Sequence, residues 1–114
     1  ELLFARSRLV IASALARIGA PVDGVTLDLA DLDLLARDVQ RARLQGFAGK
    51  LCVHPKQVAS INDGFRPAEH EVQWARQVLG TVAAHGGVGA ISLNGKLIDL
   101  PVILRAQRIL ENLA

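Results

Sequence analysis

The sequence of 114 residues has little of several residue types, and each shortage argues against a class of protein. The one cysteine, Cys52, makes an internal disulfide impossible, which fits a reducing compartment or is neutral, and we expect a cytoplasmic location. No apolar run approaches the roughly 18 residues that a membrane helix needs. Charged residues from Glu1 to Arg8 interrupt the start, so no secretory signal is visible there.

Concentrated charge of one sign is also missing. The formal net charge is +2, and no run of five or more like charges occurs. Three phenylalanines and one tryptophan are too few for the aromatic platforms on which nucleic-acid bases stack. We therefore expect neither nucleic acid nor membrane as a partner. With 51% hydrophobic and 21% charged residues, the composition is that of an ordinary globular domain.

The beginning of the chain indicates a piece of a longer protein. Methionine is absent throughout, and Glu1 leads directly into a helical pattern with no capping residue before Leu2. Apolar residues at three- and four-residue steps predict a helix over residues 2–18. Gly19 stands where the residue that ends a helix is expected.

The middle of the chain predicts a parallel strand–helix–strand unit and hence the α/β class. Alternation and β-branched residues predict a strand over residues 25–29. Asp31 is expected to cap a helix whose apolar stripe runs to Gly46. A short apolar run predicts a second strand over residues 51–53. A single helix between two strands makes them parallel.

Two further helices are expected after the second strand. Pro55 opens a short one through about Asn62, and Pro67 opens a longer one that Gly86-Gly87 ends. Two parallel strands alone cannot bury both faces of a sheet. This α/β piece is therefore expected either to complete a larger structure or to associate with partner chains.

The last part of the chain has a different pattern. Asn94-Gly95 is the strongest two-residue hairpin signal, because both turn positions need a positive φ. It predicts a hairpin of residues 88–93 and 96–98, and a final helix starts at Pro101.

Candidate site residues lie where the predicted strands end, because parallel α/β folds bind ligands at the carboxyl ends of their strands. The first strand is followed by Asp28 and Asp31, and the second by His54 and Pro55. A carboxylate and an imidazole are thus expected to flank a common cleft. Each also has a structural interpretation: Asp31 as an N-cap, Asp28 and His54 as partners of nearby backbone.

Asp99 is the third candidate. Its simplest role is to cap the last helix, which contributes about 1 kcal/mol. A capping aspartate accepts backbone N–H bonds and so stays ionised, and an ionised carboxylate on a mobile edge is also able to act as a base. From the residues alone, both roles stay open.

Several short motifs resemble those of citrate lyase beta subunits and their malyl-CoA and citramalyl-CoA lyase relatives. They follow one another in the family's order along essentially the whole chain: Phe4–Val10, Asp23-Gly24-Val25 with Asp28 and Asp31, Gly46-Phe47, Gly49-Lys50, Val53-His54-Pro55-x-Gln57, Phe65-x-Pro67, Trp74-Ala75 and Gly95–Pro101. The resemblance implies a TIM (β/α)8 barrel in a homotrimer. Residues 1–85 would hold the last two barrel strands and their helices. Residues 86–114 would form a hairpin-and-helix extension that contacts a neighbouring subunit.

The resemblance also implies an activity. The family cleaves a carbon–carbon bond in citryl, malyl or citramalyl thioesters of CoA or acyl carrier protein and releases a 2-oxo acid. The step is of the retro-Claisen type. Magnesium chelates the carboxylate and neighbouring oxygen of the 2-oxo acid, and a protein carboxylate exchanges the proton on the enolate carbon.

The family's site residues map onto few positions here. Its proton-exchanging carboxylate maps onto Asp99, and its thioester-contacting pair onto Leu51 and Cys52, with His54 and Pro55 beside them as substrate-binding residues. The side chains of Leu51 and Cys52 are apolar, so backbone groups would make any polar contact. The family's acidic metal ligands lie in earlier strands, and Asp28 and Asp31 do not match them. We therefore assign no metal ligand and expect the chain alone to be inactive.

Two other functions stay open. The hairpin and last helix would serve equally well as a non-catalytic assembly module that docks onto a neighbouring chain. A small-acid-binding α/β domain is the third possibility, with Asp28, His54 and the helix N-termini at its rim.

Overall fold

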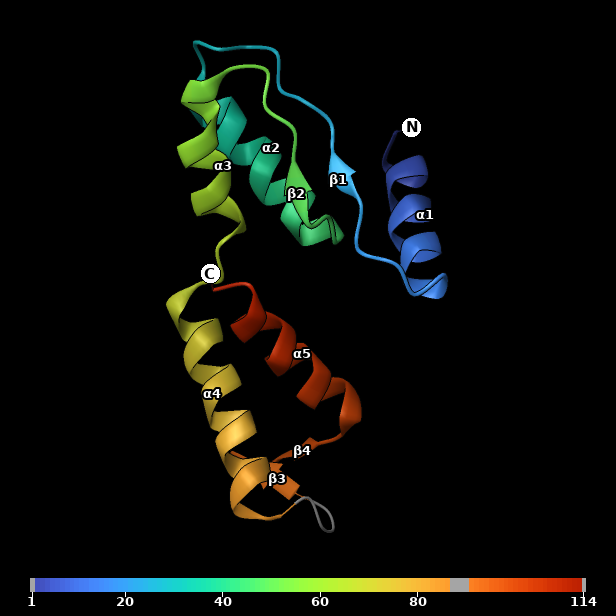
Figure 1. Cartoon of the computed structure of the whole chain (residues 1–114), viewed down its shortest axis with the longest axis vertical. Helices are drawn as coiled ribbons and strands as arrows, with labels where there is room; N and C mark the ends of the chain where they lie inside the picture. Colours follow the sequence, from blue (N-terminus) through green and yellow to red (C-terminus); the bar gives the residue numbers. More distant parts are fainter. Residues whose placement is uncertain (1, 87–90, 114) are drawn as a thin grey trace. The chain divides into compact units, whose positions relative to one another are not determined.

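Residues 2–86 and 91–113 are described by the computed structural model, and their contacts divide the chain into two units (Figure 1). The first unit comprises residues 1–65 and the second residues 66–114. The division falls well before the boundary expected after residue 85, because the long helix α4 (Glu69–Ala84) packs on the hairpin and the last helix. In the described part of the chain, no helix is long and apolar enough to cross a membrane.

A parallel pair of short strands lies in the first unit. Strand β1 (Val22–Asp23) pairs in parallel with β2 (Gly49–Lys50), residue for residue. Helix α2 (Leu32–Gln45) connects them. The predicted strand–helix–strand order and its parallel sense are therefore confirmed.

The predicted bounds of both strands are wrong, since β1 and β2 lie just before residues 25–29 and 51–53. Beyond the ladder, the buried amide of Gln57 binds backbone groups of both segments. A side chain thus takes the place of strand-to-strand bonds there. Along the first segment the buried position belongs to the polar Thr26, which is 5% exposed, and its apolar neighbours Val25 and Leu27 are exposed.

Helix α2 begins and ends where its sequence predicts. The Asp31 carboxylate accepts the Leu34 backbone N–H at 2.9 Å and caps the first turn. Gly46 closes the last turn with φ of 98°, a conformation that glycine adopts without steric cost. Both expectations are confirmed.

Helix α1 (Leu2–Leu15) ends earlier than its apolar pattern. The backbone N–H of Ile18 bonds to Ser13 O at 3.1 Å, which closes the helix end. The left-handed residue of this turn is Arg17, with φ of 57°, and not Gly19. The expectation for Gly19 is therefore wrong.

The short helix expected at Pro55 is present and continues further than predicted. A 3-10 turn, η1 (Pro55–Gln57), leads into α3 (Val58–Phe65). Helices α2 and α3 pack through a small core of Leu35, Val39 and Ile61. This packing holds the segment after β2 on the side of α2.

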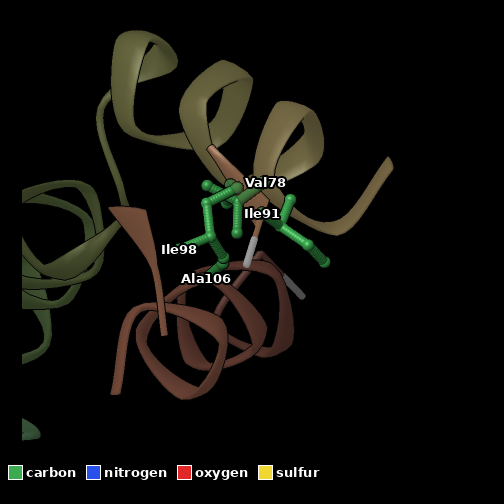
Figure 2. Close-up of a cluster of buried hydrophobic side chains, with 5 residues drawn as sticks. Val78, Ile91, Ile98 and Ala106 are labelled. Carbon is green, nitrogen blue, oxygen red and sulfur yellow. The ribbon is translucent and has the colours of Figure 1, made fainter. Parts of the chain in front are cut away.

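The second unit is a helix–hairpin–helix arrangement. Helix α4 is followed by β3 (Ile91–Leu93), β4 (Lys96–Ile98) and α5 (Leu100–Glu111). Figure 2 shows Val78, Ile91, Ile98 and Ala106 converging between the two helices and the hairpin. Each of these four side chains is at most 7% exposed, so this cluster is the core of the unit.

The turns of this unit follow the sequence closely. Asn94 and Gly95 have φ of 53° and 78°, so the predicted hairpin turn is confirmed, while residues 88–90 of the predicted hairpin lie outside the described residues. Pro67 precedes α4 instead of opening it, since Ala68 occupies the capping position and its N–H donates to Glu71 Oε2 at 3.4 Å.

Candidate functional site

The candidate site of the first unit lies on the two segments that leave β1 and β2. Because the strands are parallel, both segments leave at their carboxyl ends, and they run toward the start of α2 and of η1 (Figure 1). Ligands of parallel α/β folds bind at this edge. Asp28 and Asp31 lie on the first segment or at its end, and residues 51–55 on the second.

A buried amide joins these two segments. The Val53 backbone N–H donates to Gln57 Oε1 at 3.0 Å, and Gln57 Nε2 donates to the backbone O of Thr26 at 2.9 Å. The Thr26 hydroxyl in turn donates to Asp38 Oδ2 on α2 at 2.6 Å. Gln57 is 1% exposed, so these bonds are shielded from water. The network fixes both segments to each other and to α2.

A buried group of charges lies directly before these segments. Arg6 Nη1 on α1 donates to Asp23 Oδ1 at 2.5 Å, and Lys50 Nζ lies 3.5 Å from Asp23 Oδ2. Lys50 also donates to the backbone O of Gly24 at 2.6 Å. Asp23 is 5% exposed, and the Lys50 side chain 3%. One carboxylate thus ties α1, β1 and β2 together.

Opposing effects act on the pKa of Asp23. Burial raises the pKa of this carboxyl group, whereas hydrogen bonds from Arg6 and the Gly24 N–H and the charges of Lys50 and Arg6 lower it. The lowering effects prevail, and the pKa lies below the ordinary value for aspartate. Asp23 is therefore ionised at neutral pH and already holds two cations, which is a structural role.

The predicted substrate-binding residues all lie within residues 51–55 and are exposed. Leu51 and Cys52 follow β2, and His54 and Pro55 begin the 3-10 turn. His54 Nδ1 accepts the Lys56 backbone N–H at 3.1 Å and caps that turn. In a neutral imidazole an accepting Nδ1 places the ring proton on Nε2. The expected bond between His54 and nearby backbone is thus present, and substrate binding by His54 remains a prediction.

The two rim aspartates bind nearby backbone. Asp28 Oδ1 accepts the N–H groups of Ala30 and Asp31 at 2.9 and 3.2 Å, and Asp31 caps α2. Within the described residues, neither carboxylate is bonded to His54. A cleft shared by Asp28 and His54 therefore stays a prediction.

Asp99 lies in the second unit, at the start of α5. Its Oδ1 accepts the Val102 N–H at 3.1 Å, and its backbone O accepts the Ile103 N–H at 3.1 Å. The residue caps α5 and remains exposed. The capping role is confirmed, and a proton-exchanging role stays a prediction.

The donor set does not fit a metal site of its own. Across residues 2–86 and 91–113, no group of three or more His, Cys, Asp or Glu side chains is arranged to hold a metal ion. Magnesium prefers nearly octahedral oxygen coordination, usually with one or two carboxylates. Oδ1 of Asp28 and Oδ1 of Asp31 accept backbone N–H groups, which gives both residues a structural role.

Sequence reasoning missed the charge group and the bridging role of Gln57. The predicted first strand begins after Asp23, so the prediction does not pair this residue with Lys50. A strand that contained Asp23 would have placed a charged residue in a buried sheet, which requires an opposite charge nearby. Gln57 belongs to the motif Val53-His54-Pro55-x-Gln57, but nothing in the local sequence shows that its partner is Thr26.

Comparisons with known proteins identify a single family. A family model described as a C–C bond lyase of the TIM-barrel fold matches residues 10–112. The mitochondrial citramalyl-CoA lyase of Mus musculus is 33% identical over 111 residues, which cover 96% of this chain and 32% of that protein. The citrate lyase subunit beta of Leuconostoc mesenteroides subsp. cremoris is 37% identical over 113 residues, which cover 97% of this chain and 37% of that protein. The chain spans about a third of the length of these relatives.

Solved structures agree with this result. The crystal structure of protein CitE from Mycobacterium tuberculosis in complex with magnesium, acetoacetate and coenzyme A matches with a TM-score of 0.74 and 30% identity. The match covers 95% of this chain and 39% of that one. A citrate lyase from Burkholderia xenovorans LB400, 22% identical, matches with a TM-score of 0.75 over 94% of this chain and 33% of that one, which supports the fold alone.

Proposed function

Since the chain belongs to the C–C bond lyase family of the TIM-barrel fold, we propose that it is part of an enzyme that cleaves a carbon–carbon bond in an acyl thioester. The substrate would be a citryl, malyl or citramalyl thioester of CoA or acyl carrier protein. The proposal is supported by the names of the relatives and by the coenzyme A in the CitE complex. The observation that carries it is the exposed segment 51–55 at the carboxyl edge of a parallel strand pair.

The first unit would be the end of a (β/α)8 barrel, with its last two strands. Five large apolar residues of the strand pair and of the two segments that follow it are exposed: Val22 by 56%, Val25 by 40%, Leu27 by 77%, Leu51 by 58% and Val53 by 45%. Parallel sheets are normally covered on both faces. The earlier strands of the whole barrel would cover these side chains.

The second unit would contribute a carboxylate. Cleavage converts the substrate's C–OH into the C=O of the 2-oxo acid, with loss of the hydroxyl proton, and leaves the bonding electron pair on the carbon next to the thioester carbonyl. This enolate carbon takes up a proton. Asp99 would exchange that proton, in the site of a neighbouring subunit of a homotrimer. Capping α5 does not prevent this role, because a carboxylate has about four acceptor positions and the cap uses one.

Magnesium, where bound, would stabilise negative charge on substrate oxygens. Because the described residues do not fit such a site, its ligands are expected in a part of the whole enzyme outside this chain. The chain by itself is therefore expected to be inactive.

Turnover of the whole enzyme tests the proposal. Wild-type enzyme should cleave at least one of citryl-, malyl- and citramalyl-CoA, and Asp99→Asn should lower kcat by about 10²- to 10⁴-fold, the usual contribution of general acid–base catalysis. Asparagine caps helices as well as aspartate does, so the variant should keep its thermal stability. Unchanged turnover in Asp99→Asn would refute the catalytic role, and no turnover of any of the three by wild type would refute the lyase.

An assembly role for the second unit is the alternative, and one observation favours it. Three leucines of β4 and α5 are exposed: Leu97 by 62%, Leu100 by 64% and Leu104 by 46%. In that case Leu97→Glu with Leu100→Glu would dissociate the oligomer, whereas Asp99→Asn would leave turnover intact.

A further inference from the structure

We infer that Gln57 is a positioning residue, whose buried amide sets the direction of the Cys52 backbone carbonyl, which would accept a pantetheine N–H of the thioester substrate. This inference rests on the proposed function for its consequence. Its structural content is independent of the reaction: one side chain fixes peptide groups on both segments that leave the parallel strands.

The burial of Gln57 is the first observation. Four residues form the group of largest fully buried side chains, and Gln57 is the polar one among them; the others are Leu35, Val39 and Val78. A buried amide destabilises a fold unless its hydrogen bonds are made, and here Oε1 and Nε2 each make one. The amide is therefore held at both ends, and its plane is fixed.

Peptide geometry relates the Gln57 bond to the candidate site. The Val53 N–H that donates to Gln57 belongs to the same peptide group as the Cys52 carbonyl. The described chain contains no cis peptide, and in a trans peptide the C=O points opposite to the N–H. The Cys52 carbonyl is therefore directed away from Gln57.

The same geometry applies to the other segment. Gln57 binds the backbone O of Thr26, so the N–H of Leu27, in the same peptide group, also points away from the amide. One acceptor and one donor are thus directed away from a single buried side chain. Thr26 is itself held by Asp38 on α2, so the segment does not simply follow Gln57 if that residue moves.

A glutamate at this position provides a sharp test in the whole enzyme. A protonated carboxyl has the same donor and acceptor as the amide, whereas an ionised one has no donor and places negative charge against the Thr26 carbonyl. Burial would raise the pKa of the introduced carboxyl above the about 4.3 of an exposed glutamate. The variant should therefore behave like wild type at low pH and lose the bridge as pH rises.

Two measurements follow for Gln57→Glu, with Gln40→Glu on the exposed face of α2 as the control for added charge. At neutral pH the KM for the CoA thioester should rise by at least about tenfold, with a smaller change in kcat. The ratio of the variant's KM to the wild-type KM should fall as pH is lowered. Hydrogen exchange of the Val53 amide should be faster than in wild type at neutral pH, and the two exchange rates, compared at the same pH, should converge as pH is lowered.

Gln57→Met removes both bonds without adding charge, and it should show the same rise in KM and the same fast exchange at every pH. A merely structural role would lower the folded fraction, and hence the apparent kcat, at an unchanged KM. A KM equal to that of Gln40→Glu at all pH values, or wild-type exchange at Val53, would overturn the inference. Absence of turnover in wild type would count against the lyase instead, and the exchange measurement would still decide whether Gln57 fixes the segment.

Discussion

Arg6 and Asp23 join the first helix to the first strand through a bond of 2.5 Å between Nη1 and Oδ1. The guanidinium also donates from Nε to Gln45 Oε1 at 2.7 Å and lies 4.5 Å from the centre of the Phe47 ring. Helix α1 itself has no buried residue. The polar contacts of Arg6 therefore help to hold α1 in the first unit.

Acid should weaken the first unit through Asp23. Because the folded-state pKa of this carboxyl lies below its unfolded value, ionised Asp23 stabilises the fold above about pH 4, and this contribution is lost as pH falls through the folded-state pKa. Asp23→Asn should lower the free energy of unfolding at pH 7 by about 3–5 kcal/mol, because Arg6 and Lys50 lose a buried partner. Urea titrations between pH 7 and pH 3 measure both effects.

The exposed Asp33 provides the matched control. Asp33→Asn should change stability at pH 7 by no more than about 1 kcal/mol, the usual contribution of an acid in the first turn of a helix. If Asp23→Asn lost stability between pH 4 and pH 3 as steeply as wild type does, the assignment would be wrong.

Gly64 allows a close approach of two helices, and a methyl group there should disturb it. A Cβ on Gly64 would lie 2.2 Å from Cγ1 of the buried Val39. Gly64→Ala should therefore destabilise the first unit by about 1–3 kcal/mol, as overpacking does. Part of this loss should be recovered in the double variant with Val39→Ala, which a double-mutant cycle measures.

Gly80, within α4, is the natural comparison. Nothing lies within 4 Å of a Cβ placed there, and its backbone is helical. Gly80→Ala should stabilise the protein by roughly 0.5–1 kcal/mol, since alanine is the better helix former. Equal effects of the two substitutions would show that the contact with Val39 is not the cause.

Features that act on their own neighbouring backbone could be predicted from the sequence. Asp31 and Asp99 cap the helices that follow them, and Asn94-Gly95 makes the turn between adjacent strands. Each partner lies within about four residues, so the chemistry is visible in a short stretch of sequence. The parallel order of the strands was also predictable, because one helix separates them.

Features that depend on distant partners could not be predicted. The bounds of β1 follow from pairing with β2, and from the Gln57 amide that binds Thr26 beyond the ladder. Arg17 takes the left-handed position at the end of α1 although a glycine stands two residues later. Nothing in either local sequence indicates these outcomes, and the substrate-binding roles of Leu51 and Cys52 depend on a ligand as well.

The hairpin turn should be sensitive to a side chain at Gly95. Its φ of 78° lies in the left-handed region, which costs other residues about 1–2 kcal/mol. Gly95→Ala should destabilise the second unit by that amount in thermal or urea unfolding. Gly19→Ala is the control, because its φ is not in that region and no atom lies within 4 Å of the added Cβ. A loss of stability as large at Gly19 would contradict the argument.

Two substitutions of Asp99, which caps α5, separate its contribution to stability from its proposed role in proton exchange. Removing the acceptor with Asp99→Ala leaves the Val102 N–H without its partner and should lower the stability of the second unit by about 1 kcal/mol. Asp99→Asn should cost at most a few tenths, because asparagine accepts the same bond. Trp74, the one tryptophan of the chain, packs against the core of this unit, so its fluorescence reports the unfolding directly. If Asp99→Asn destabilised the unit as much as Asp99→Ala, the carboxylate charge and not the bond to Val102 would stabilise α5. The loss of turnover in Asp99→Asn would then no longer report on proton exchange alone.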